Sequence, residues 1–403
     1  MFPLAAIALV AVSPAPDQLE ELVRRSAEIP HFQAIFELSS TTSAATSEIR
    51  IDCGGPTRVR VDRGAEGKRT SMWSVDGTLA IVSNEGGRPM HGRVDAHELY
   101  AVFDAVEAQL VRDFPGAKPR GELHSAVSMR WHFDEKTAKS NFAVETTITT
   151  GSPTPMGWLD TLVQKEAAPV EEGELLKFST DGHFDLSVSR LTGMLQEFRG
   201  RSPKGEMRVL LKSTEFASAP PAQRFEIEPA PQGGEDVSSE LRRTIARVAE
   251  LQLRRRMYDT LAAAKGPLDG PESAHGLATL KVRSLCRRLH EVTLTPVVEQ
   301  ARESIAKARG LALEHLKKLR NEGVTPEELS TWSARQLTLF EEQLAILDSS
   351  IPARTQPPPG AQELPNAREL SAIEATVLRE LWRDTGVEPL MAECRRAFDE
   401  ASR

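Results

Sequence analysis

The most constraining feature of this 403-residue sequence is a change in the spacing of its apolar residues near residues 232–236. Before this point apolar side chains mostly alternate with polar ones, the pattern of β-strands with one buried face. Beyond it they recur at intervals of three and four, the pattern of amphipathic helices. A chain that carries both periods, and that exceeds the roughly 250–300 residues of a single core, is expected to form two domains.

The alternating half, residues 17–231, predicts about ten strands, most of them consecutive. The clearest are Phe32–Leu38, Ile49–Ile51, Val59–Val61 and Phe184–Val188. Consecutive strands favour an antiparallel sheet, and a sheet of this size curls or closes rather than staying flat. The predicted fold class is α+β: a curled antiparallel sheet, or half-open barrel, with covering helices, followed by an all-α domain.

Two helices and one tight turn are expected inside this β-rich half. Residues 17–29 show helical spacing and end before Pro30. The dipeptide Asp76-Gly77 suits a hairpin turn with positive φ. Residues 95–114 are expected to form one helix that covers the sheet with an apolar stripe of Leu99, Val102, Phe103, Val106 and Leu110.

Residues 232–403 predict five or six helices in an irregular bundle. Helix starts are expected at Thr295-Pro296 and at Thr325-Pro326, where Glu328 completes a capping box. Residues 352–365 form a Pro-rich loop inside this domain. Three consecutive arginines at 254–256 fan around a helix, so they are interpreted as solvated flanks, with a docking surface for an acidic partner as the alternative.

Residues 1–16 form an apolar run of the length of a signal-peptide core, too short for a stable membrane anchor. A signal peptide is therefore predicted, with a periplasmic or secreted location and no transmembrane span after its removal. No Lys or Arg precedes the run and proline follows both candidate cleavage points. A buried N-terminal strand or a misplaced start codon is the alternative.

Composition and motif searches exclude several function classes. A net charge of −8 and a pI near 5.7 argue against nucleic acid as a partner. No nucleotide-binding, serine-hydrolase or zinc-protease motif occurs, so no catalytic residue, metal site or cofactor is predicted. His183, between Asp181 and Asp185, is interpreted as part of a solvated strand face rather than as a proton relay.

Only three cysteines are present: Cys53, Cys286 and Cys394. Cys286 and Cys394 share the helical half and can pair in an oxidising compartment. Three buried thiols that behave as small apolar residues are the equally weighted alternative.

The order of elements in the first half resembles the periplasmic lipoprotein carriers of the LolA/LolB-like family. The resemblance is carried by Leu19–Val23, Phe32–Phe36, Gly54–Val59, Asp76–Gly77 and Phe184–Gly193. It implies a sheet curled into a half-open barrel whose apolar concavity receives acyl chains. The family has no counterpart of residues 232–403, which places lipoprotein shuttling itself in question.

Two functions are favoured as hypotheses over a third, an enzyme whose candidate residue is His183. The first is an exported carrier of an apolar ligand or lipid acyl chain, with a concave face lined by Phe32, Phe36, Ile49, Ile51, Val59, Val61, Trp73, Ile81, Trp131 and Phe133. The alternative is that the same residues form a packed core beneath the helices. The second is a non-catalytic structural or interaction protein of the envelope, whose helical domain binds a protein partner.

Overall fold

The computed structural model describes residues 17–41, 43–65, 68–134, 139–150, 156, 158–159, 170–180, 184–202, 205–263, 272–358, 361–362, 364, 367–384 and 387–402. The predicted signal peptide and the Asp181–His183 segment lie outside them. The chain divides into two compact units. The β unit comprises residues 1–101 and 119–252, and the helical unit comprises residues 102–118 and 253–403.

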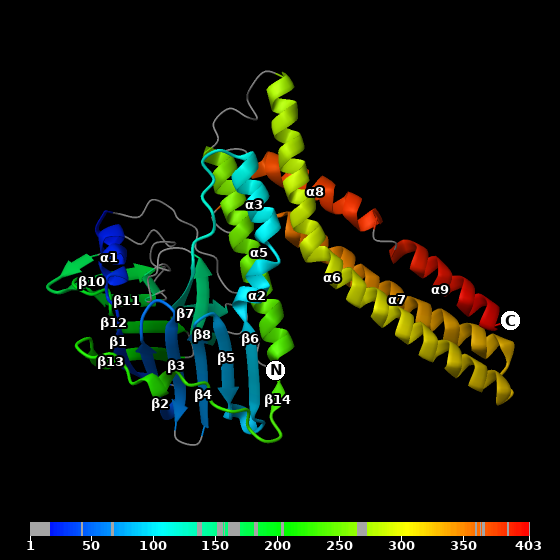
Figure 1. The fold of residues 1–403 in the computed structure, drawn as a ribbon. Coiled ribbons are helices and arrows are strands. Elements are labelled where there is room, and N and C mark those ends of the chain that lie inside the picture. The colour runs from blue at the N-terminus through cyan, green and yellow to red at the C-terminus, as the bar shows by residue number, and fades with distance from the viewer. Residues whose placement is uncertain are drawn as a thin grey trace. The chain divides into compact units, whose positions relative to one another are not determined.

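A twelve-stranded sheet forms the β unit within the described residues (Figure 1). Its first meander contains β1 (Phe32–Ser40), β2 (Ser43–Cys53), β3 (Arg58–Ala65), β4 (Lys68–Val75), β5 (Thr78–Ser83) and β6 (Met90–Asp95). Its second meander contains β9 (Val170–Glu172), β10 (Leu175–Thr180), β11 (Phe184–Ser189), β12 (Leu195–Ser202) and β13 (Gly205–Glu215).

The two meanders join where β1 pairs antiparallel with β13. At one edge of the sheet β14 (Glu235–Asp236) pairs parallel with β6. The sheet twists strongly, because β3–β6 and β12–β13 run in clearly different directions in Figure 1. The predicted α+β class, with a large and mostly antiparallel sheet followed by a helical region, is confirmed.

A long hairpin stands apart from this sheet. Strands β7 (Leu123–Asp134) and β8 (Lys139–Thr150) form a two-stranded sheet of their own, to which Met156 adds a parallel bridge at Val127. They contact β3 and β4, and β8 also contacts β5 and β12. The sequence pattern placed these strands in the main sheet, but they pack against it as a second layer.

The Asp76-Gly77 hairpin forms as expected between β4 and β5. Asp76 has φ 48° and Gly77 has φ 83°, the two positive values of the tightest hairpin turn. Thr57 donates to Asp76 Oδ1 at 2.8 Å, and Arg58 lies 3.0 Å from Oδ2. Hydrogen bonds to Arg58 and Thr57 lower the pKa of the Asp76 carboxyl.

The first predicted helix is present as α1 (Asp17–Ala27), whose Leu19 and Leu22 are buried. The second is divided in two: α2 (Ala96–Ala101) belongs to the β unit and α3 (Asp104–Asp113) to the helical unit. The single continuous helix is wrong, and Val102 at the break is 51% exposed, whereas the other four residues of the predicted stripe, Leu99, Phe103, Val106 and Leu110, are buried. Instead α3 contacts the long helix α6.

Helix α5 (Ser238–Ala263) begins in the β unit and ends in the helical unit. Its start is tied to the sheet, because Val237 N donates to His91 O and Arg93 N donates to Ser238 Oγ. The segment 232–236, expected to separate the domains, therefore lies within the β unit.

The helical unit also contains α6 (Glu272–Asn321), α7 (Pro326–Thr355), α8 (Ala367–Asp384) and α9 (Val387–Ser402). The Thr325–Glu328 capping box at the start of α7 is confirmed. The helix start expected at Pro296 is wrong, because α6 passes through this proline without interruption. Figure 1 shows α6 changing direction along its length, as a helix does where proline removes a hydrogen bond.

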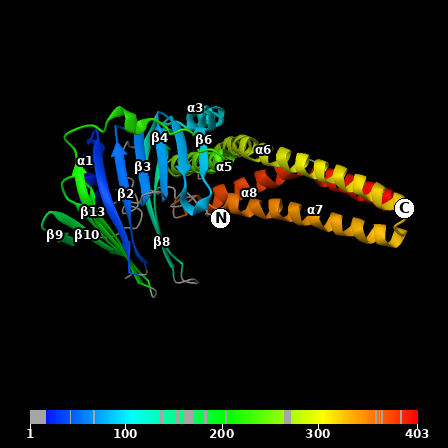
Figure 2. The same cartoon turned by 90° about the horizontal axis from the view of Figure 1, so that it is seen from below.

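Two groups of helices pack along α6. Its first half contacts α8 and α3. Its second half runs beside α7 and α9 (Figure 2), around a core that includes Ile305, Leu316, Leu329, Phe340, Met391 and Phe398. None of the helices in the described part of the chain combines the length and apolarity needed to cross a membrane.

Candidate functional site

The inner face of the sheet collects six of the ten predicted lining residues. They are Phe32, Phe36, Ile49, Ile51, Val59 and Val61, which belong to one apolar cluster on β1, β2 and β3. The strand register pairs Phe36 with Ile49 and Ile51 with Val61, so period-two alternation turns all six the same way.

These six side chains are covered rather than open. The layer above them includes Leu19 and Leu22 of α1, Val127 of β7, Val144 of β8 and Trp158. Trp158 Nε1 donates to Gly193 O at 2.9 Å, which fixes the indole over this layer. A side chain that lines a hollow wide enough for an acyl chain keeps exposed surface, and each of the six has none.

The other four predicted lining residues do not share this environment. Ile81 lies opposite Met72 on the inner face and is only half-buried. Trp73 lies on the opposite face of the sheet, because its register partner is Arg60 whereas Val61 faces Met72. Trp131 and Phe133 lie in β7, and their side chains are outside the described part of the structure.

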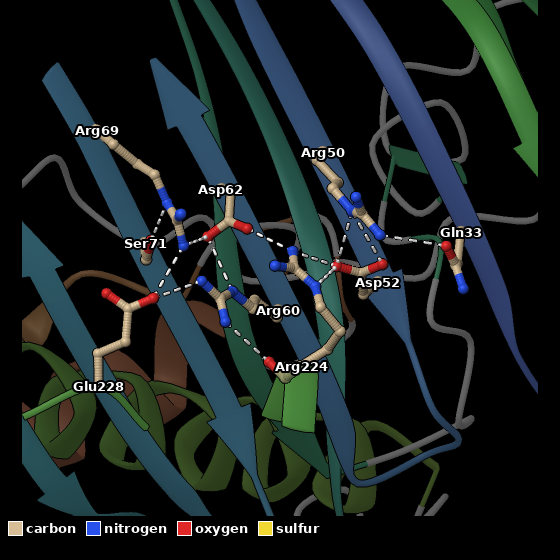
Figure 3. A network of polar contacts seen from close by, with 9 residues as sticks. All are labelled: Gln33, Arg50, Asp52, Arg60, Asp62, Arg69, Ser71, Arg224 and Glu228. Carbon is tan, nitrogen blue, oxygen red and sulfur yellow. Dashed lines mark hydrogen bonds and ion pairs between the residues drawn. The ribbon is translucent and has the colours of Figure 1, made fainter. Parts of the chain in front are cut away.

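The outer face of the same strands carries a buried polar network, the outer-face cluster (Figure 3). Alternation brings charged residues of β2, β3 and β4 to this side, opposite the apolar cluster. A connecting segment, residues 216–231, adds two more charged side chains and is called the strap. The members are Gln33, Arg50, Asp52, Arg60, Asp62, Arg69, Ser71, Arg224 and Glu228.

Arg224 of the strap bridges two buried carboxylates. Its Nη2 lies 2.6 Å from Asp52 Oδ2 and 2.5 Å from Asp62 Oδ2. Asp52 has no exposed surface, so its charge depends on Arg224 and on Arg50, whose Nε lies 3.2 Å away. Partial burial opposes the charged form of Arg224, but the hydrogen bonds to Asp52 and Asp62 prevail and raise its pKa.

Arg60 connects the sheet to the strap. It donates to Asp62 Oδ1 at 2.9 Å, to the carbonyl oxygen of Arg224 at 3.1 Å and to Glu228 Oε1 at 2.7 Å. Its guanidinium carbon lies 4.7 Å from the ring centre of Trp73, a cation–π contact. Trp73 is thus buried within a polar assembly and not in the apolar core.

Arg69 brings a second guanidinium to the same carboxylate oxygen of Glu228. Its Nη2 lies 2.9 Å from Glu228 Oε1 and 3.0 Å from Asp62 Oδ1, and its Nε donates to Ser71 Oγ at 2.8 Å. The side chains of Arg69 and Glu228 are 43% and 44% exposed, so this end of the cluster is in contact with solvent.

A second buried ionic cluster lies in the helical unit. Arg254 donates to Glu374 Oε1 at 3.1 Å and to Oε2 at 2.7 Å, and Tyr258 donates to Oε2 at 2.9 Å. His290 Nε2 lies 3.5 Å from Oε1. Burial opposes ionisation of Glu374, but its contacts with His290 and Arg254 prevail and lower its pKa. The interpretation of Arg254 as a solvated flank is wrong, because it is 1% exposed at this site.

The three cysteines are free and buried. Burial raises the pKa of the Cys53 thiol to about 11 and that of Cys286 well above its ordinary value. Cys286 and Cys394 are unpaired, which agrees with the alternative of three buried thiols. Among the described residues no group of three or more His, Cys, Asp or Glu side chains is arranged to hold a metal ion.

No protein-family model and no curated protein sequence matches the chain. Similar solved structures include MucB in complex with MucA(peri), at 16% identity and TM-score 0.25, over 52% of this chain and 58% of that one. The MucA/MucB complex of Pseudomonas aeruginosa has 16% identity and TM-score 0.24, over 53% and 62%. MucB alone has 16% identity and TM-score 0.22, over 54% and 66%. This chain thus spans about three fifths of the length of these three solved chains.

Proposed function

We propose that this chain is a non-catalytic interaction protein of the cell envelope whose helical unit binds another protein. The observation that carries the proposal is an exposed apolar ridge on the α6–α7 hairpin. The hairpin ridge consists of the exposed Leu311 and His315 on α6, the exposed Leu339 on α7, and Trp332 on α7, which is half-buried against the hairpin core.

The four ridge residues share one side of the hairpin. Leu311 and His315 are one helical turn apart, and Trp332 and Leu339 are two turns apart, so each pair faces one way. The His315 and Trp332 rings, 5.2 Å apart, join the two helices. Leu311 is 61% exposed and Leu339 is 51% exposed, although the neighbouring helix faces bury a complete core.

An exposed apolar ridge with an aromatic pair is characteristic of protein-binding surfaces. Trp is among the residues that dominate binding energy at such interfaces, and exposed leucines around it exclude water. The long α6 and α7 helices hold the ridge rigidly, which reduces the entropy lost on binding.

Site-specific photo-crosslinking tests the proposal in the protein's own cells. A photoreactive residue at position 311 or 339 is expected to give one discrete adduct, which the substitution Trp332→Ala removes. Position 280 is the control, because Leu280 lies on the same helix, is 64% exposed and is outside the ridge. Equal adducts at all three positions, or none at 311 and 339, contradict the proposal.

The envelope location in this proposal rests on the apolar run of residues 1–16. Fusion of the full chain to an alkaline phosphatase that is active only outside the cytoplasm tests it. Activity is expected for the full chain and not for a chain that begins at residue 17. We also propose that the β unit is LolA/LolB-like, supported by the twisted, mostly antiparallel sheet with α1 against its inner face.

A carrier of an apolar ligand is the second candidate. It is supported by half-buried apolar residues that adjoin the packed cluster, Leu38, Met72, Met207 and Leu211, and by the half-buried Ile81 opposite Met72. Each buried methylene of a ligand contributes about 0.8 kcal/mol, so a single acyl chain suffices for tight binding. Native mass spectrometry of protein purified without detergent tests it: a co-purifying lipid supports the carrier, and uniformly ligand-free protein rejects it.

A further inference from the structure

The strap is fastened to the outer face of the sheet mainly by charged groups. Arg224 reaches Asp52 on β2 and Asp62 on β3, and Glu228 reaches Arg60 on β3 and Arg69 on β4 (Figure 3). Its apolar contacts come from Phe225, whose ring lies against Gly54, from the buried Pro220, and from Phe216, which packs against the inner apolar cluster 6.4 Å from the Phe32 ring. The inner face is covered in a different way, by a continuous apolar cluster.

The sheet presents Arg60 and Arg69 in the geometry that recognises a peptide carboxylate. Both guanidinium groups converge on one oxygen of Glu228, and Arg60 also donates to the main-chain carbonyl four residues earlier. A side-chain carboxylate and a main-chain carbonyl at fixed spacing are features of an extended peptide. Charge-assisted contacts of this kind are the strong and selective ones.

The arginines are positioned by the sheet and not by the strap. Arg60 is held by Asp62 on its own strand and by the Trp73 ring, and Arg69 is held by Asp62 and Ser71. None of these contacts involves a residue of the strap. Within the sheet part of the cluster, Arg50, Arg60 and Arg69 face Asp52 and Asp62, three positive charges against two negative ones. Arg60 and Arg69 are complementary to a carboxylate, and Asp52 and Asp62, which Arg224 of the strap now contacts, are complementary to a base.

The strap is also an incomplete partner for this face. Trp73 has no exposed surface, and its indole Nε1–H has no hydrogen-bond partner. A buried donor without a partner costs free energy. The Glu228 side chain is 44% exposed, so salt partly screens its ion pairs with Arg60 and Arg69 and a competing carboxylate can reach them.

We propose that the outer face of β2–β4 is a binding site for an extended peptide segment of a partner protein that carries a basic and an acidic side chain four residues apart, and that the strap occupies this site as an intramolecular ligand. The partner supplies a carboxylate to Arg60 and Arg69 in place of Glu228, and a base to Asp52 and Asp62 in place of Arg224. This site lies in the β unit and is independent of the hairpin ridge.

The strap's own sequence is the probe. A fluorescein-labelled peptide of residues 222–231, Ala-Gln-Arg-Phe-Glu-Ile-Glu-Pro-Ala-Pro, is titrated with the full-length protein by fluorescence anisotropy. The substitution Glu228→Gln in the protein weakens the intramolecular ligand, so the peptide is expected to bind about tenfold more tightly than to the wild type. Glu226→Gln is the matched control, because Glu226 is an exposed carboxylate of the same strap.

Two further measurements distinguish recognition of the peptide carboxylate by the sheet from release of the strap. A peptide with Gln in place of the glutamate at 228 is expected to bind the Glu228→Gln protein about tenfold more weakly than the unmodified peptide. Hydrogen exchange in residues 216–231 is expected to be faster in Glu228→Gln than in Glu226→Gln.

Equal affinity of the peptide for wild type and Glu228→Gln overturns the proposal. So does an absence of binding to Glu228→Gln at millimolar peptide. Hydrogen exchange then shows which part failed: unchanged strap protection means that the strap is not released, and faster exchange without binding means that the face does not recognise a carboxylate. Circular dichroism confirms that each variant is folded.

Discussion

The inner and outer faces of strands β1–β4 are both covered by other parts of the chain, but by opposite means. The inner face carries aliphatic and aromatic side chains beneath α1 and the β7–β8 hairpin, whereas the outer face carries charged side chains beneath the strap. Apolar burial is favourable wherever it occurs, but buried charges are favourable only while every partner is present. The inner face is therefore expected to supply stability, and the outer face to supply specificity for whatever covers it.

The largest effect is expected from the inner face. Phe36→Ala is expected to reduce the free energy of unfolding of the β unit by about 3–5 kcal/mol, because it leaves a cavity in a packed core. Ile35→Ala, on the opposite face of the same strand and only half-buried, is the control. Urea unfolding followed by circular dichroism measures both. An equally large reduction in the free energy of unfolding for Ile35→Ala would contradict the larger contribution to stability expected of the inner face.

The next effect is expected from the outer face. Asp52→Ala leaves Arg224 without one of its two carboxylates and is expected to cost about 2–3 kcal/mol, less than a fully buried pair because Arg224 is partly exposed. A double-mutant cycle with Arg224→Ala measures the interaction. The double variant is expected to lose less stability than the sum of the two single variants; additive losses would mean that the pair is not coupled.

A smaller effect is expected where the strap meets the sheet. A methyl group at residue 54 would lie 2.7 Å from the Phe225 ring, so Gly54→Ala is expected to cost about 1–3 kcal/mol. Faster hydrogen exchange is expected in the strap and not in α1. Adding Phe225→Leu is expected to restore part of the loss, and no restoration would locate the strain elsewhere.

The smallest effect is expected beyond the strap, at Glu197. Partial burial opposes ionisation of its carboxyl, but hydrogen bonds from Arg199 and Arg208 prevail and lower its pKa. Because this pKa is lower in the folded than in the unfolded protein, the ionised carboxyl stabilises the fold at pH values above the unfolded pKa of about 4.3. This stabilisation is lost as the pH falls through the folded pKa. Glu197→Gln is expected to cost about 1 kcal/mol or less at pH 7, and the difference from wild type is expected to vanish at acidic pH. A difference that is independent of pH contradicts this assignment.

Local signals predicted several features correctly. Asp76-Gly77 encodes its turn in two residues, and the Thr325–Glu328 box encodes the start of α7. The six inner-face residues followed from alternation alone, because the period of a strand fixes which side chains share a face. Alternation also separates the two faces of each strand, so Trp73 could have been assigned to the outer face had β4 been recognised.

Other features depend on contacts far along the chain and have no local signal. Arg254 finds Glu374, 120 residues away, and Arg224 finds Asp52, 172 residues away. The β7–β8 hairpin has an ordinary strand pattern, and only its packing decides that it forms a second layer. At Pro296 the packing of α6 against other helices overrides the local preference for a break.

The continuity of α5 across the division between the units has a practical consequence. The polypeptide passes from one unit to the other after Ala101, Lys118 and Gln252, and the last passage occurs in the middle of this helix. No single cut yields both halves intact: severing at 231 removes β14 and the start of α5, and severing at 252 divides a helix. Each unit is thus built from two separate stretches of the chain. Separate expression of either half is expected to give an aggregating or protease-sensitive product.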